Sequence, residues 1–320
     1  LQAQSPRREF WMTDGPIHAM SLCGNTLYIG GNFRAVGPPT GGGAPMDTGS
    51  STLAGGFPSV AGSVRTVVSD GAGGWYIGGT FQSVGGFARS NLAHILADNS
   101  LAPWSPNADS TVNALALVGS TAYVGGRFTR VGGQPRSRIA ALDATTGLAG
   151  AWDPAANAPV HTLAVSGSAV YAGGDFTGIG GQFRNHLAAL DPSSGLATTW
   201  NPNLDDAVHA LVLVGITVYA GGTFTSAGGF PRARVAALDV ASGLPLAWNP
   251  NANGAVLALA SNGPTVYVGG SFTTIGGQPR RAVAALDSAS GLATAWHPSV
   301  SPWEEVHAIA VRGSTVFYGG

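Results

Sequence analysis

The chain has 320 residues, of which 44% are hydrophobic and only 10% are charged, and this apolar content is enough to build a folded core. A formal net charge of −1 argues against a protein that binds nucleic acid by neutralising phosphates. Every basic residue is an arginine, so chemistry that needs a lysine nucleophile is excluded.

The single cysteine, Cys23, can form neither an internal disulfide nor a cysteine-based zinc site. Apolar runs are only a few residues long, so we expect no membrane span. The chain starts at Leu1 rather than at a methionine, and the segment from Leu1 to Arg8 has the character of a mature N-terminus left after removal of a signal peptide. We therefore expect a secreted protein. The alternative to a self-contained repeat array is a fragment of a longer chain.

In chain order, the first predicted element is a lone strand within residues 1–16. A unit of about 48 residues then repeats to the end of the chain. Its aromatic marker falls at Trp11, Phe57, Trp104, Trp152, Trp200, Trp248 and Trp296. A second marker, Gly-Gly-x-Phe, begins at Gly30, Gly78, Gly125, Gly173, Gly221 and Gly269. A period of this length indicates a stacked or radial repeat architecture.

The repeat at residues 208–255 illustrates the expected elements. Strands are predicted at 208–213 and 217–220, followed by a glycine-rich loop. A third strand at 234–238 leads through an Asp-x-x-Ser-Gly turn to a fourth strand at 244–248. No window shows a convincing helical period of 3.6 residues.

Four short strands per unit predict a β-propeller blade. We expect one all-β domain over residues 1–320, a propeller of four-stranded antiparallel blades. Seven blades fit best, with the closing blade shared between the two termini. The expected segments are 1–16 as the closing strand, repeats at about 17–63, 64–111, 112–159, 160–207, 208–255 and 256–305, and 306–320 as a partial last blade. A β-solenoid is the less favoured alternative, because its coils are usually shorter and its strands parallel.

One extended motif is shared by most of the repeats. Val-Tyr-x-Gly-Gly-x-Phe-Thr-x-x-Gly-Gly-x-x-Arg precedes Ala-Ala-Leu-Asp-x-x-Ser/Thr-Gly-Leu-Ala-x-x-Trp at residues 218–248 and 266–296, and a close variant occurs at 124–152 and 170–200. This unit resembles the delta-60-type repeat of secreted bacterial β-propellers, and the resemblance covers essentially the whole chain. It implies a propeller fold, an extracellular or cell-surface location and no general catalytic activity, and it leaves the ligand open. The final part also resembles the tryptophan-docking repeat of quinoprotein propellers, a likeness that concerns packing rather than a cofactor.

The first strand of each blade is expected to line a central channel. Its second residue is, in successive repeats, His18, Arg65, Asn113, His161, His209, Leu257 and His307. A ring of imidazoles at a channel mouth could bind a metal or an anion, or respond to pH. The favoured alternative is a set of polar residues at a wet rim that bond to neighbouring backbone, since no Asp or Glu recurs with the series.

One arginine per repeat follows the second Gly-Gly pair, at Arg89, Arg136, Arg184, Arg232 and Arg280. The favoured interpretation is structural, with each side chain bonded to carbonyls of a neighbouring loop. The functional alternative is a positive ring on one face that holds sulfated or carboxylated glycans. The recurring Asp143, Asp191, Asp239 and Asp287 are predicted to form turns rather than to act as catalytic acids.

Asp205 and Asp206 form an acidic pair in one inter-repeat loop and are interpreted as a departure from the repeat. A calcium site there is one hypothesis and a solvated loop is the favoured one. No other cofactor is expected. The glycine loops are not phosphate cradles, because no helix is predicted to follow them.

These features favour a non-catalytic scaffold or recognition module, secreted or at the cell surface, that meets a glycan or protein partner on its loop-rich face. A subunit that self-associates into a surface layer or filament is one alternative. The other is a hydrolase or lyase that uses the channel-mouth histidines. Catalysis is not expected, because catalytic sites usually break the symmetry of a repeat with a few unlike polar residues.

Overall fold

A computed structural model describes residues 13–37, 40–50, 52–53, 55–298 and 305–320. Within these residues the chain forms strands and no helix, so no helix there could cross a membrane. All of the strand pairs are antiparallel and the sheets hold two to four strands, which confirms the all-β prediction. The predicted strand within residues 1–16 falls mostly on residues 1–12, outside the described part. Contacts divide the chain into two compact units, residues 8–160 and residues 161–320 with 1–7.

The first unit holds the sheets of three repeats. Its strands are β1 (Ile17–Cys23), β2 (Thr26–Gly31), β3 (Gly43–Asp47), β4 (Val60–Ser69), β5 (Trp75–Val84), β6 (Phe87–Ala88), β7 (Leu92–Ile95), β8 (Val112–Val118), β9 (Thr121–Gly126), β10 (Arg130–Val131), β11 (Gln134–Pro135) and β12 (Ile139–Asp143). The sheet orders are β1-β2-β3, β4-β5-β7 with β6 also on β5, and β8-β9-β12, while β10 and β11 form a small hairpin.

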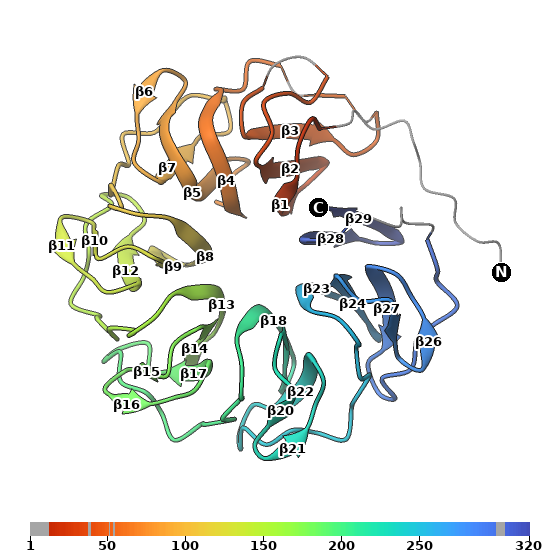
Figure 1. Ribbon diagram of the computed structural model, residues 1–320. Coiled ribbons are helices and arrows are strands. Elements are labelled where there is room, and N and C mark those ends of the chain that lie inside the picture. The colour runs from red at the N-terminus through yellow and green to blue at the C-terminus, as the bar shows by residue number, and fades with distance from the viewer. Residues whose placement is uncertain (1–12, 38–39, 51, 54, 299–304) are drawn as a thin grey trace. The chain divides into compact units, whose positions relative to one another are not determined.

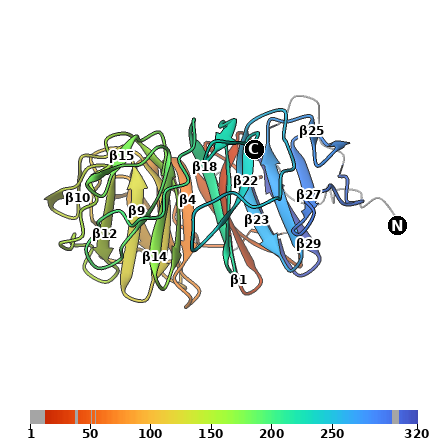
Figure 2. The same ribbon diagram turned by 90° about the horizontal axis from the view of Figure 1, so that it is seen from below.

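The second unit repeats the same plan. Its strands are β13 (Val160–Ser166), β14 (Ala169–Gly174), β15 (Gly178–Ile179), β16 (Gln182–Phe183), β17 (Leu187–Leu190), β18 (Val208–Val214), β19 (Thr217–Gly222), β20 (Ser226–Ala227), β21 (Phe230–Pro231), β22 (Val235–Asp239), β23 (Val256–Asn262), β24 (Thr265–Gly270), β25 (Thr274–Ile275), β26 (Gln278–Pro279), β27 (Val283–Asp287), β28 (Ala308–Arg312) and β29 (Thr315–Gly319). Within this unit β18, β23 and β28, the first strands of successive repeats, lie next to one another in Figure 1. Figure 2 shows β23 and β27 along their length.

The paired glycines explain how neighbouring sheets come so close. A Cβ atom added at Gly221 would lie 2.3 Å from Cγ1 of Val256 in the next repeat, and one added at Gly269 would lie 2.6 Å from Cγ1 of Val306. Only glycine leaves room for this approach. The paired glycines therefore allow the close contact between repeats.

The recurring tryptophan joins one repeat to the next. Trp200 is buried and its Nε1 donates to the carbonyl of Asp239 at 2.9 Å, and Trp248 does the same to Asp287. Its ring meets a tyrosine edge-on, as for Tyr171 and Trp200 at 5.2 Å between centroids. Phe57 takes this place in the first repeat, against Tyr28 at 5.2 Å. The recurring aromatic residue thus packs between neighbouring sheets.

The predicted fourth strand of the blade is wrong. Residues 244–248 form no strand and make one isolated bridge, between Leu238 and Pro245. The carbonyl of Leu246 accepts a hydrogen bond from a side chain, Arg232, rather than from a further strand. The glycine-rich segment in turn contains the hairpin β20–β21, which the sequence analysis treated as loop. Each typical repeat is therefore a three-stranded sheet with a small hairpin.

Candidate functional site

The histidine-rich series lies at a recurring β-bulge. In five repeats the register between the first two strands shifts by one residue, and the extra residue projects out of the regular pairing. These extra residues are His18, Arg65, Asn113, His209 and Leu257. The backbone therefore redirects the same position in these five repeats, but the side chains placed there differ in chemistry.

Two members of the series come together in the second unit. The rings of His161 and His209 lie 5.2 Å apart at an angle of 38°. His161 Nε2 also lies 2.9 Å from Oδ1 of Asp175. Asp175 fills the variable position of Gly-Gly-x-Phe, so the repeat pattern gave no signal that it would reach a first strand.

Burial of His209 lowers its pKa below the ordinary value of a histidine, and the nearby charge of His161 lowers the pKa further. The carboxylates of Asp175 and Asp206 act in the opposite direction and do not cancel the effect. The neutral form of His209 is thus favoured in the folded chain.

The other members of the series have separate partners. Asn113 Nδ2 donates to the carbonyl of Val160 at 3.1 Å, and His307 Nε2 lies 3.6 Å from a carboxylate oxygen of Glu305. Asp175 and Glu305 therefore accompany single histidines of the series, although no Asp or Glu recurs with the series in the sequence. Among the described residues, no group of three or more His, Cys, Asp or Glu is placed to hold a metal ion.

The loop arginines act as clamps on the backbone. In each case Nη1 donates to the carbonyl of the preceding residue and Nη2 to a carbonyl thirteen or fourteen residues further on, as Arg232 does to Pro231 at 2.7 Å and Leu246 at 2.6 Å. The same pairs occur at Arg89, Arg136, Arg184 and Arg280. The clamp holds the segment that precedes the tryptophan, which supports the structural interpretation of these residues.

The interpretation of Asp205 as a departure from the repeat is wrong. Asp109, Asp205 and Asn253 recur at one position, and each accepts a hydrogen bond from the amide twenty residues on. The two aspartates also accept from the threonine hydroxyl there, as Asp205 does from Thr225 at 2.5 Å, whereas Asn253 Nδ2 donates to the hydroxyl of Thr273. Oxygen atoms already facing N–H and O–H donors are poorly placed for calcium. Asp206 instead accepts from the amide of Ala207.

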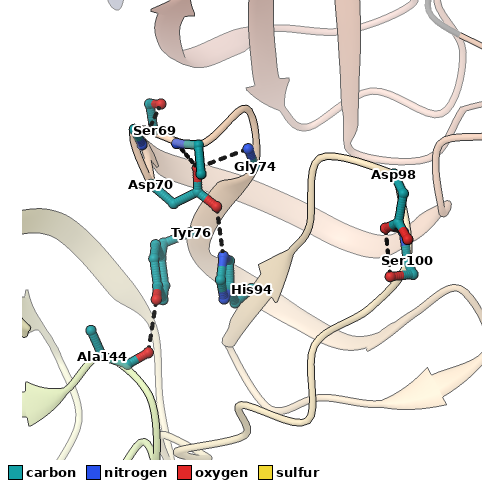
Figure 3. Close-up of polar contacts among 10 residues, drawn as sticks. Ser69, Asp70, Gly74, Tyr76, His94, Asp98, Ser100 and Ala144 are labelled. Atoms are coloured by element: carbon teal, nitrogen blue, oxygen red, sulfur yellow. Dashed lines mark hydrogen bonds and ion pairs between the residues drawn. The ribbon is translucent and has the colours of Figure 1, made fainter.

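Figure 3 shows a polar cluster in the first unit that the sequence analysis missed. His94 Nε2 lies 3.1 Å from Oδ2 of Asp70, and the His94 ring stacks on Tyr76 at 3.9 Å with an angle of 9°. Tyr76 Oη donates to the carbonyl of Ala144 at 2.7 Å. The only signal in the sequence was His94 itself. It pairs with Tyr76, whereas in later repeats the residue that pairs with the equivalent tyrosine is alanine.

This cluster is built to hold a turn. Burial alone would raise the pKa of Asp70, but hydrogen bonds from His94 and from the amides of Ala72 and Gly74 outweigh it and hold the pKa below its usual range. The His94 and Asp70 side chains are only 13% and 12% exposed. Ser69, next to Asp70, uses its Oγ to accept from the Gly71 amide, so it does not complete a nucleophilic triad.

A groove of about 530 Å³ opens in the second unit, at the junction of two repeats. One wall comes from the Trp-Asn-Pro-Asn loop, one from the hairpin β25–β26, and one from the turn after β27. The lining residues are Asn249, Pro250, Asn251, Thr274, Ile275, Gly276, Gly277, Gln278, Pro279, Ser290, Gly291 and Leu292. They supply amides, hydroxyls and apolar surface, and none of them is charged.

The walls of this groove are fixed by the backbone. The Gly276 amide donates to the Pro250 carbonyl at 2.8 Å, and Asn251 adopts the left-handed conformation with φ 56°. The carboxamide of Asn253 accepts from the amides of Thr273 and Thr274 at 2.8 Å and 2.9 Å. The groove therefore exists without a ligand to form it.

Neither the protein-family models nor the curated proteins include a match to this chain. Among solved structures it is similar to a computationally designed protein, Ika8, with a TM-score of 0.60 and 16% sequence identity. The match covers 99% of this chain and 96% of that chain. Ika8 is propeller-like, and at this identity the likeness concerns the fold alone.

Proposed function

We propose that this chain is a non-catalytic recognition module, a seven-bladed β-propeller that is secreted or displayed at the cell surface and binds neutral glycan on its loop-rich face. The seven first-strand positions and the likeness to a propeller-like design support the architecture.

The chemistry of the groove at Asn249–Asn251 carries this proposal. Its lining combines carboxamides and hydroxyls, which exchange hydrogen bonds with sugar hydroxyls, with proline, isoleucine and leucine surface that suits the C–H faces of a sugar ring. A lining without charge favours a neutral ligand, because a charged one would lose hydration without gaining a partner.

The arrangement of the polar clusters favours binding over catalysis. Each clamp arginine uses two of its N–H groups on backbone carbonyls, as Arg280 does at 2.8 Å and 2.7 Å, so a sulfated glycan has less to gain from them. The His94 and Asp70 pair holds a turn, and His161 faces Asp175 rather than a hydroxyl nucleophile.

The test is calorimetric titration of the protein with neutral oligosaccharides, using hexamers of glucose, xylose, mannose and N-acetylglucosamine, and with heparin as the anionic comparison. We expect at least one neutral hexamer to bind and heparin to bind more weakly. Gln278→Ala removes an exposed carboxamide from the groove and should weaken binding of that hexamer by roughly 5-fold to 10-fold, the effect of about one hydrogen bond.

Gln82→Ala, which changes an exposed amide on β5 away from the groove, is the matched control and should leave the affinity unchanged. A complete lack of binding to every neutral hexamer would sink the proposal. Tighter binding of heparin would instead favour the arginine-ring hypothesis.

A further inference from the structure

The frame of this groove occurs a second time in the same unit, one repeat earlier. The Gly228 amide donates to the Pro202 carbonyl at 2.6 Å, as Gly276 donates to Pro250 at 2.8 Å. Asn203 is left-handed with φ 47°, matching Asn251. The hairpins β20–β21 and β25–β26 pair with the same two-residue register. The same backbone arrangement is thus present at both places.

The two places differ at the tip of the hairpin. Phe230 of β21 stands where Gln278 stands in β26, and 53% of its surface is exposed. Leu244, which stands where Leu292 lines the groove, is 57% exposed. An exposed ring beside a polar frame offers a flat apolar surface against which the C–H face of a pyranose can stack.

The corresponding place in the first unit departs from this chemistry. The Gly132 amide donates to the Pro106 carbonyl at 2.7 Å there, but Arg130 stands at the position of Ser226 and Thr274 and is exposed. A charged wall makes that place less suited to a neutral ligand. The groove at Asn251 and the equivalent place at Asn203 both lack a charged residue at these positions.

We propose that the groove at Asn251 and the equivalent place at Asn203 are tandem subsites for one neutral polysaccharide, and that the subsite with Phe230 at its hairpin binds more tightly. The inference rests on the proposed function and adds the number of sites, their ranking and a polymeric ligand. A polymer that reaches both subsites gains effective concentration over a short oligosaccharide, so it should bind with higher apparent affinity.

The test is titration with the neutral hexamer that binds best, followed by its parent polysaccharide, on the full chain. We expect two sites per chain for the hexamer. Phe230→Ala should weaken one of the two sites by roughly 5-fold to 10-fold, the effect of losing about one aromatic contact. The polysaccharide should lose more apparent affinity than the hexamer on this substitution.

Phe87→Ala is the matched control. Phe87 stands at the same hairpin position and is 65% exposed, but its hairpin bonds through Gly85 to Ser59 and faces no left-handed asparagine. It should leave both hexamer sites intact. Equal losses of affinity from Phe230→Ala and Phe87→Ala would overturn the inference. A single hexamer site that Gln278→Ala abolishes would also overturn it, but that result would leave the proposed function standing. A lack of binding to any hexamer would contradict the proposed function itself, on which this inference rests.

Discussion

Left-handed residues mark fixed points in each repeat. Asn107, Asn203 and Asn251 adopt φ of 49°, 47° and 56°, and Ala155 occupies the same position with φ 50°. Asparagine tolerates this conformation because its short side chain bonds locally, whereas the Cβ of alanine is crowded by the following carbonyl. One repeat thus carries a strain that its neighbours avoid.

Replacing this alanine should stabilise the chain. Ala155 is exposed, so Ala155→Asn creates no clash, and we expect the free energy of unfolding to rise by roughly 0.5–1 kcal/mol. Chemical denaturation measures the change. Ala156→Asn is the contrasting variant, since Ala156 is buried and an amide there should destabilise. A lower stability for Ala155→Asn would contradict the strain argument.

Single-residue roles were predictable only where the repeat fixed them. The turn aspartates follow from spacing: Asp239 accepts from the amide and hydroxyl of Ser242, each at 2.7 Å. Asp175 and Asp70 could not be foreseen as histidine partners, because each contact joins segments far apart in sequence. The groove at Asn251 was suggested only in outline by the Trp-x-Pro-Asn loop.

At the scale of the element, the segment that ends in tryptophan connects one repeat to the next and does not form a strand. Its carbonyl is clamped by an arginine, and its ring enters the next sheet, as Trp200 enters the cluster of Phe224 and Leu238. Sequence patterns gave the first three strands of a repeat, because alternation and turns are local signals. They also predicted the fourth, but its residues make only an isolated bridge: the Leu246 amide donates to the Ala237 carbonyl at 2.8 Å, and the Leu246 carbonyl accepts from the Arg232 side chain.

The contact of this tryptophan with the next repeat can be weakened while an aromatic ring is kept in its place. Trp200→Phe keeps an aromatic ring, as Phe57 does naturally, but removes the hydrogen bond to Asp239 and leaves a space in a buried site. We expect the free energy of unfolding to fall by roughly 1–3 kcal/mol. Denaturant titration measures the change.

Phe183→Leu serves as the comparison for that variant, because Phe183 is 90% exposed and its loss should change stability little. Equal effects of the two substitutions would mean that the tryptophan contributes no more than a surface aromatic.

At the scale of the whole molecule, the stability should depend on pH through His209. Its pKa is lowered by burial and by His161, against the opposing pull of Asp175 and Asp206. The unfolded chain therefore binds a proton more readily than the folded chain. The stabilisation is complete above the ordinary histidine pKa of about 6.5 and is lost as the pH falls through the lower folded value.

We expect the melting temperature of the wild-type chain to fall between pH 7.5 and pH 5.5. His209→Leu, which introduces the residue found at position 257, should reduce that fall. His297→Leu changes an exposed histidine and should retain the wild-type pH response. An unchanged response in His209→Leu would show that the pH dependence has another origin.

Because of the arginine clamps, cleavage by trypsin reports the local opening of each repeat. With no lysine in the sequence, trypsin can cut only after arginine. At Arg184, Arg232 and Arg280 the side chain that the protease must take into its specificity pocket is held by two backbone carbonyls. Cleavage at these residues therefore requires the hairpin to release its neighbouring segment first. A time course of tryptic peptides would rank the repeats by how readily each one opens.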